Sequence, residues 1–141
     1  MVNSGIELDI KVPNQTKYLS LIGRIGEDIA REIDRFTGDR ETLAYQLNLV
    51  LTEAMTNAIK YGNTDNREET VHILINIAEN QLFIRIFDYG QGFDINEIPA
   101  PDFDKLEDRG RGIFLIKAMM DSVTYVRNTA GNVLELVKQL A

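Results

Sequence analysis

The chain has 141 residues, of which 44% are hydrophobic and 26% are charged, a composition that suits one globular domain with a substantial core. Its 22 acidic and 15 basic residues give a net charge of −7 without any Lys/Arg-rich run, which disfavours direct binding to nucleic acid. The absence of cysteine excludes disulfides and thiol chemistry. No apolar run is long enough to cross a bilayer and no charged-then-apolar leader opens the chain, so we expect a single domain over residues 1–141 of a soluble, cytoplasmic protein.

The first third of the chain predicts a strand and then a helix. Residues 6–12, IELDIKV, alternate apolar and charged side chains, as a strand with one solvent face does, and Pro13 ends this alternation. A set of apolar residues at spacings of three and four then predicts a helix whose stripe stops near Gly38: Leu19, Ile22, Ile25, Ile29 and Ile33.

A second helix follows, with Asp39 as its N-cap, Thr42 nearby and Gly62 as its C-terminal cap. Its apolar face consists of Leu43, Leu47, Val50, Ala54, Ala58 and Tyr61. At 100° per residue, Glu53 lies about 60° and Asn57 about 20° from Val50, so both polar side chains lie on or beside this face. An inward carboxylate is costly unless it meets a charged or hydrogen-bonding group. The alternative is that Glu53 is a surface residue at the edge of the stripe and Asn57 a helix-packing amide.

A hairpin is predicted next, over TVHILINIAENQLFIRIFDYG, with its turn at 79–81. Continued alternation puts Asp88 on the same inward face as Ile84 and Ile86, and Gly90 and Gly92 follow it. A buried carboxylate needs hydrogen-bond donors, and glycines allow another group to approach the backbone. The alternative is an aspartate that merely closes a turn in DYGQG.

Residues 94–108 contain two prolines and no sustained period, which is typical of a long lid or binding loop. After them, in RGRGIFLIKAMMDSV, Gly110 and Gly112 precede a helix and so offer free N–H groups to an anion, with Arg109 and Arg111 adding positive charge. The last residues predict one more hairpin, around 128–131. The elements together predict an α+β fold, a two-layer sandwich of a mixed, mostly antiparallel sheet with helices on one face.

These motifs, in this order, resemble the ATP-binding signature shared by DNA gyrase B, MutL and sensor histidine kinases, the GHKL fold. EAMTNAIKYGN resembles its N box, DYGQGF its first glycine box and RGRGIFLIKAMMD its second. Within that superfamily, LTEAMTNAIKYG and GIFLIKAMMDSV are most similar to the anti-sigma factor serine/threonine kinases. The resemblance covers the chain from Ile6 to Leu140.

The resemblance implies ATP and Mg²⁺ as cofactors and assigns roles to the inward polar residues. Asn57 would be the Mg²⁺ ligand through its side-chain oxygen, a ligand type that suits a hard cation. Asp88 would receive the adenine amino group, while Gly90 and Gly92 keep side chains away from the base.

The resemblance also implies a phosphate site and a catalytic group. Lys60 and Tyr61 would reach the phosphates, and Glu53 would be the general base for the attacking hydroxyl. The second glycine box would hold the triphosphate through Gly110, Gly112 and one or both of Arg109 and Arg111, and an arginine that does not meet the γ-phosphate would meet a partner protein.

A protein of this kind is expected to phosphorylate a serine or threonine of an anti-anti-sigma protein, to sequester a sigma factor and to act as a homodimer. It would influence transcription through protein partners, with no direct contact to nucleic acid and no contact to a membrane. The chain departs from the family at Gly131 and Asn132, where many members have a Gly-Thr pair that helps to hold the nucleotide.

Other functions remain open at this stage. The first is an ATP-gated protein-binding regulatory module with little or no phosphoryl transfer, although such a module would not need the Glu53 carboxylate. The second is a detached histidine-kinase catalytic domain, yet the only histidine, His72, lies within a predicted strand and is more simply a solvent-facing residue. A structural role without a nucleotide would leave Glu53, Asn57 and Asp88 unexplained together.

Overall fold

The computed structural model describes residues 5–34, 36–61, 70–88, 111–128 and 131–140. In chain order its elements are β1 (Ile6–Pro13), the short 3₁₀ helix η1 (Thr16–Tyr18), α1 (Leu19–Glu32), α2 (Arg40–Tyr61), β2 (Thr70–Ala78), β3 (Gln81–Asp88), α3 (Arg111–Met119), β4 (Ser122–Asn128) and β5 (Gly131–Gln139). Within these ranges, none of the helices has the length and apolar character that spanning a membrane requires.

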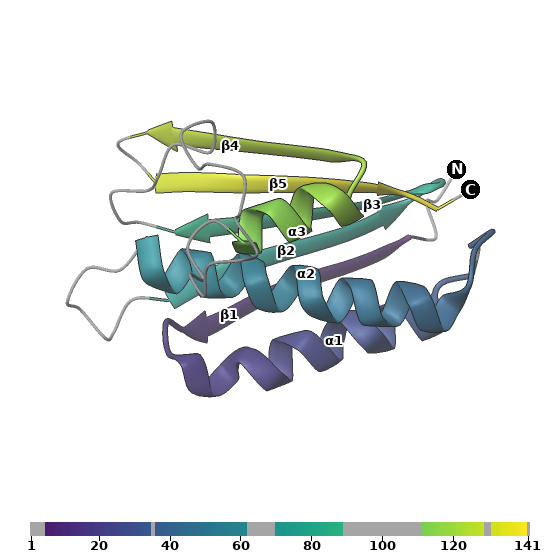
Figure 1. The fold of residues 1–141 in the computed structure, drawn as a ribbon, viewed down its shortest axis with the longest axis horizontal. Helices are drawn as coiled ribbons and strands as arrows, with labels where there is room; N and C mark the ends of the chain where they lie inside the picture. The colour runs from purple at the N-terminus through teal and green to yellow at the C-terminus, as the bar shows by residue number, and fades with distance from the viewer. Residues whose placement is uncertain (1–4, 35, 62–69, 89–110, 129–130, 141) are drawn as a thin grey trace, which may run out of the picture.

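The five strands form one sheet in the order β1-β2-β3-β5-β4 (Figure 1). Each neighbouring pair of described strands is antiparallel, so the parallel pairing that a mixed sheet would contain does not occur among them. The register places Asp88 of β3 directly opposite Asn132 of β5. The strand and both hairpins predicted from the alternation of apolar residues are therefore confirmed.

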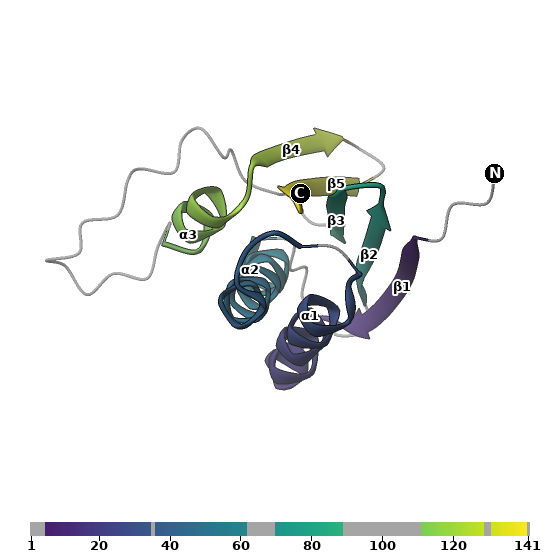
Figure 2. The ribbon, with the colours of Figure 1, turned by 90° about the vertical axis from the view of Figure 1, so that its right-hand side faces the viewer.

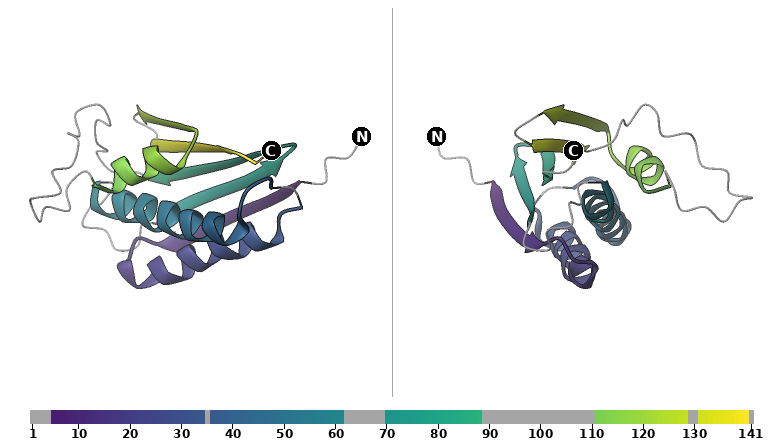
Figure 3. Two further views of the ribbon diagram at one scale, coloured as in Figure 1. Left: turned by 45° about the vertical axis from the view of Figure 1, so that its right-hand side comes forward. Right: turned by 90° about the vertical axis from the view of Figure 1, so that its left-hand side faces the viewer.

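The helices cover one face of this sheet, as the end-on view in Figure 2 shows. Both views in Figure 3 show the same two layers, with α2 between α1 and α3. Alternate strand residues face the helices and form the core with the apolar faces of α1, α2 and α3; among them Ile73, Ile75, Leu82, Ile84, Ile86 and Leu136 are fully buried. The predicted two-layer α+β sandwich is confirmed.

The contact between α1 and α2 is close because Gly26 lacks a side chain. A Cβ atom at Gly26 would lie 2.8 Å from the backbone oxygen of Leu47, a distance that real Cβ atoms do not reach. The helix α1 ends at Glu32, earlier than the apolar stripe predicted, and Ile33 continues into the core in an extended conformation. Arg40 at the start of α2 donates hydrogen bonds to the Ile33 and Ala30 carbonyl oxygens, which satisfies acceptors that the end of α1 exposes.

The start of α2 has the predicted cap. Asp39 accepts hydrogen bonds from the backbone N–H of Glu41 (3.1 Å) and from the Thr42 hydroxyl (2.9 Å). The first hairpin turn consists of Glu79 and Asn80 alone, because Gln81 already pairs with Ala78. The predicted C-terminal cap at Gly62 and the predicted loop over 94–108 lie outside the described residues.

Candidate functional site

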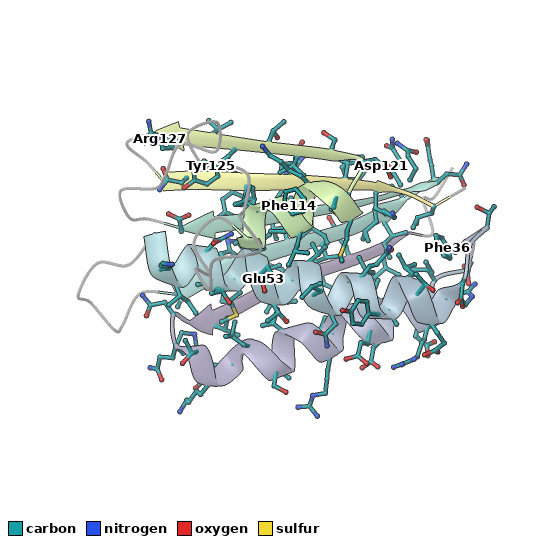
Figure 4. The ribbon with its side chains drawn as sticks, in the orientation of Figure 1. Phe36, Glu53, Phe114, Asp121, Tyr125 and Arg127 are labelled. Carbon is teal, nitrogen blue, oxygen red and sulfur yellow. The ribbon has the colours of Figure 1, made fainter. Side chains whose placement is uncertain are left out.

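The second half of α2 brings Glu53 and Asn57 against the start of α3. The two residues are one helical turn apart; Asn57 is buried at 9% exposure, and Glu53 is half-buried. A Cβ atom at Gly112 would lie 2.7 Å from Oε2 of Glu53 and 3.4 Å from Nδ2 of Asn57, so a glycine is what allows α3 to approach this closely. Figure 4 shows Glu53 on α2 beside α3, which carries Phe114. The predicted N box and second glycine box therefore meet at one place.

The buried amide of Asn57 has an unsatisfied atom. Its Nδ2 lies beneath the surface without a hydrogen-bond partner among the described residues. Such an atom costs about 1–3 kcal/mol of folding free energy, so its retention suggests that the amide serves a ligand. The nitrogen and oxygen of an amide are close to interchangeable in shape, and the oxygen is a suitable ligand for a hard cation. The described residues contain no group of three or more His, Asp or Glu side chains that could hold a metal.

The second inward carboxylate, Asp88, ends β3 on the helix-covered face and is 5% exposed. Asn132, 2% exposed, donates a hydrogen bond from Nδ2 to Oδ1 of Asp88 at 2.7 Å. The Tyr125 hydroxyl donates to Oδ2 at 3.4 Å. A carboxylate can accept about four hydrogen bonds, so the chemistry of this group suits a ligand that offers a donor.

The remaining predicted site residues are only partly within the described structure. Lys60 lies exposed near the end of α2, one turn beyond Asn57. Tyr61 and Arg111 are described by their backbones, as the last residue of α2 and the first of α3. Gly90, Gly92, Arg109 and Gly110 lie outside the described residues.

The second glycine box differs in one respect from the prediction. Since α3 begins at Arg111, Gly112 lies within the first helical turn and does not precede the helix. The first turn of a helix has N–H groups without intrahelical partners, so Gly112 still belongs to a backbone segment that can donate to an anion.

Two ion pairs, His72–Asp9 and Arg85–Glu135, lie on the opposite face of the sheet, away from this site. His72 Nε2 lies 2.6 Å from Oδ1 of Asp9, and the His72 ring stacks on Phe87. Its place on the helix-free face agrees with a solvent-facing strand residue. Away from the site as well, the hydrogen bond and charge of Glu41 raise the pKa of Arg31 above its ordinary value.

The contacts of Asn132 and Tyr125 with Asp88 are not predicted by the sequence, although the resemblance places Asn132 where many family members hold the nucleotide. Asn132 alternates with Leu134 and Leu136, and this period of two indicates an inward polar residue. Tyr125 carries no such pattern, because a tyrosine packed against the core from an edge strand is common.

Comparison with known proteins identifies relatives of the whole chain. The model of the histidine kinase-like ATPase domain matches residues 12–138. The serine-protein kinase RsbW of Oceanobacillus iheyensis is 29% identical over 95% of this chain and 87% of its own length. RsbW of Bacillus subtilis is 26% identical over 99% of this chain and 89% of its own length.

Solved structures share the fold. The RsbU and RsbW domains of a Mycobacterium tuberculosis protein match with a TM-score of 0.69 and 14% identity over 96% of this chain, which spans 32% of that longer chain. The histidine kinase domain of a blue-light activated kinase from Erythrobacter litoralis matches with a TM-score of 0.55 and 18% identity, over 92% of this chain and 62% of that one.

Proposed function

Because the chain belongs to the family of histidine kinase-like ATPase domains, we propose that it is an ATP-dependent protein serine/threonine kinase and anti-sigma factor. Its phosphoacceptor would be a serine or threonine of an anti-anti-sigma protein, and its second activity would be sequestration of a sigma factor. The relatives named serine-protein kinase RsbW support this choice within the family. The observation that carries it is the contact of Glu53 and Asn57 with Gly112 at the start of α3.

The proposed nucleotide site extends from Asp88 to α3. Asp88 would accept a hydrogen bond from the adenine amino group, and Gly90 and Gly92 would leave room for the base. The Oδ1 atom of Asn57 would hold Mg²⁺, whose charge neutralises the negative charge of the triphosphate. The partnerless amide nitrogen of Asn57 supports a ligand at this position.

The phosphates would lie at the N-terminus of α3. Backbone N–H groups of its first turn favour an anion, and the dipole of the helix adds to this effect. Lys60 and Tyr61 at the end of α2 would approach the phosphates from the other side. The second glycine box would complete the site through Arg109, Gly110, Arg111 and Gly112.

Glu53 would act as the general base. As the acceptor hydroxyl oxygen bonds to the γ-phosphorus, its proton passes to the Glu53 carboxylate and the bond to the bridging oxygen of ADP breaks. A base of this kind contributes about 10²- to 10⁴-fold to the rate. Its half-buried position beside Gly112 gives a protein hydroxyl access from solvent while limiting how far the carboxylate moves.

In this proposal, residues 1–141 form one ATP-binding domain of a cytoplasmic protein that acts as a homodimer. It would bind neither nucleic acid nor a membrane directly. The net charge of −7 supports regulation through protein partners, because like charge repels a phosphate backbone.

Titration calorimetry with Mg²⁺ and β,γ-imido ATP tests the nucleotide site. Wild-type protein should bind saturably, and Asp88→Asn, which replaces an acceptor by a donor of the same shape, should not. If folded wild-type protein failed to bind, the kinase proposal would be wrong.

A transfer assay with labelled ATP and a candidate anti-anti-sigma protein tests the chemistry. Glu53→Gln should keep the affinity for β,γ-imido ATP and lose about 10²- to 10⁴-fold in transfer rate. Equal transfer by Glu53→Gln would refute the role of Glu53 alone. Saturable binding without transfer by wild type to any acceptor would instead identify an ATP-gated binding module.

A further inference from the structure

Within the described part of the chain, side chains from two different strands donate hydrogen bonds to the Asp88 carboxylate: an amide of β5 and a phenol of β4. Asn132 of β5 donates to Oδ1 at 2.7 Å, and Tyr125 of β4 donates to Oδ2 at 3.4 Å. The antiparallel register places Asn132 directly opposite Asp88, and Tyr125 lies diagonally from Asn132 across the β4–β5 pair. Each carboxylate oxygen therefore has its own donor.

This arrangement restricts the rotation of the Asp88 carboxylate about its Cβ–Cγ bond. Rotation about the bond between Cβ and the carboxylate carbon is broad, so an aspartate does not hold its oxygens in one plane by itself. Donors on both oxygens restrict that rotation. Because Asp88 and Asn132 are 5% and 2% exposed, water does not compete freely for the stronger of the two bonds.

We infer that Asn132 and Tyr125 are positioning residues that orient the Asp88 carboxylate and thereby make the site select adenine over guanine. This inference rests on the proposed nucleotide site. Adenine offers an exocyclic amino donor, whereas guanine offers a carbonyl oxygen at the same place, which a fixed carboxylate repels. A carboxylate that is free to rotate discriminates less between adenine and guanine. Water or another donor can then lie between the carboxylate oxygen and the guanine carbonyl oxygen.

Matched substitutions at position 132 separate the effect of the hydrogen bond to Asp88 from the effect of side-chain shape. Thr and Val have the same branched shape and both suit a strand, but only Thr can donate to Asp88. Titration calorimetry with β,γ-imido ATP and β,γ-imido GTP would be run on wild type, Asn132→Thr, Asn132→Val and Tyr125→Phe. Thermal unfolding of each protein would report stability separately.

Asn132→Val should weaken binding of the ATP analogue about tenfold, whereas Asn132→Thr should stay within about threefold of wild type. The ratio of ATP to GTP affinity should fall in the Val variant and be retained in the Thr variant. Tyr125→Phe, which removes the longer contact, should cost about threefold. A purely structural role would lower the unfolding temperature of Asn132→Val and leave the affinity ratio of the folded protein unchanged.

Equal affinity of the Thr and Val variants for the ATP analogue would overturn the inference, as would a wild-type protein that binds both analogues equally. A wild-type protein that binds neither would instead overturn the proposed function itself. If Asn132→Val fails to fold, Asn132→Ser against Asn132→Ala makes the same comparison, because only serine keeps a donor.

Discussion

Gly26 of α1 and Gly112 of α3 each lie in close contact with α2, and these two contacts have different consequences. A Cβ atom at Gly26 of α1 would lie 2.8 Å from the backbone oxygen of Leu47, and one at Gly112 of α3 would lie 2.7 Å from Oε2 of Glu53. The distances are nearly equal, but a backbone oxygen within a helix cannot move alone, whereas the end of a glutamate side chain can. The first contact therefore sets the helix packing, and the second sets the place of a carboxylate.

The polar groups near these two contacts also differ, in whether they have hydrogen-bond partners. Beside the α1 contact, Nδ2 of Asn48 donates to Oε2 of Glu27 at 2.6 Å, and the Thr56 hydroxyl donates to the Thr52 carbonyl oxygen at 2.7 Å. Beside the α3 contact, Nδ2 of Asn57 is buried without a described partner. The polar groups named beside α1 are hydrogen-bonded within the helical layer, whereas the buried amide nitrogen beside α3 is not.

Asn57→Leu should separate function from stability most clearly. Leucine has a similar size and cannot bind a cation, so the Mg²⁺-dependent affinity for β,γ-imido ATP should fall about 100-fold or more, equivalent to ~2.7 kcal/mol. Because the amide nitrogen has no bond to lose, the free energy of unfolding should stay constant or rise by about 1 kcal/mol. Calorimetry and urea unfolding measure the two quantities.

Asn48→Leu is the matched control on the same helix. Its amide is hydrogen-bonded to Glu27, so its loss should lower the free energy of unfolding by about 1 kcal/mol and leave nucleotide affinity unchanged. Normal affinity in Asn57→Leu would show that the Asn57 amide is not a ligand.

The periodicity of the sequence predicted the fold well because burial dictates it. It failed at the end of α1, where Ile33 is buried although the helix stops at Glu32. An apolar stripe reports which residues face the core, and an extended residue after a helix can face the core as well. The sequence also predicted that α3 starts after Gly112, whereas the helix starts at Arg111. Glycine has a low helix propensity, which favours a helix start after it, but Gly112 lies in the first turn.

For the candidate site, the sequence predicted burial only where a polar residue interrupts an apolar face. Asn57 and Asp88 do so within a helix and a strand, and both are buried. The approach of Gly112 to Glu53 depends on how α3 packs on α2, which no local pattern encodes. The contact of Tyr125 with Asp88 likewise depends on the pairing of β4 with β5.

Gly26→Ala should have the next largest effect, and it should change only the free energy of unfolding. Overpacking against the Leu47 backbone costs about 1–3 kcal/mol, and the better helix propensity of alanine offsets up to about 1 kcal/mol of that cost. Urea unfolding should therefore show a net loss, with unchanged nucleotide affinity in the folded protein. Ser20→Ala, on the exposed face of the same helix, should change the free energy of unfolding by less than about 0.5 kcal/mol. Equal stability of Gly26→Ala and wild type would mean that α1 shifts without cost.

Gly112→Ala tests the other contact and should act on catalysis. The new methyl group and Oε2 of Glu53 cannot both keep their places, so the carboxylate moves and kcat for transfer should fall about tenfold, equivalent to ~1.4 kcal/mol. Alanine favours the helix, so the unfolding temperature should stay constant or rise. Ala118→Gly, at an exposed position of α3, should do the opposite and lower stability while kcat is retained. If Gly112→Ala transferred phosphate at the wild-type rate, catalysis would not require the position that Gly112 gives to the Glu53 carboxylate. The contacts of Gly26 and Gly112 would then differ only in how the helices pack.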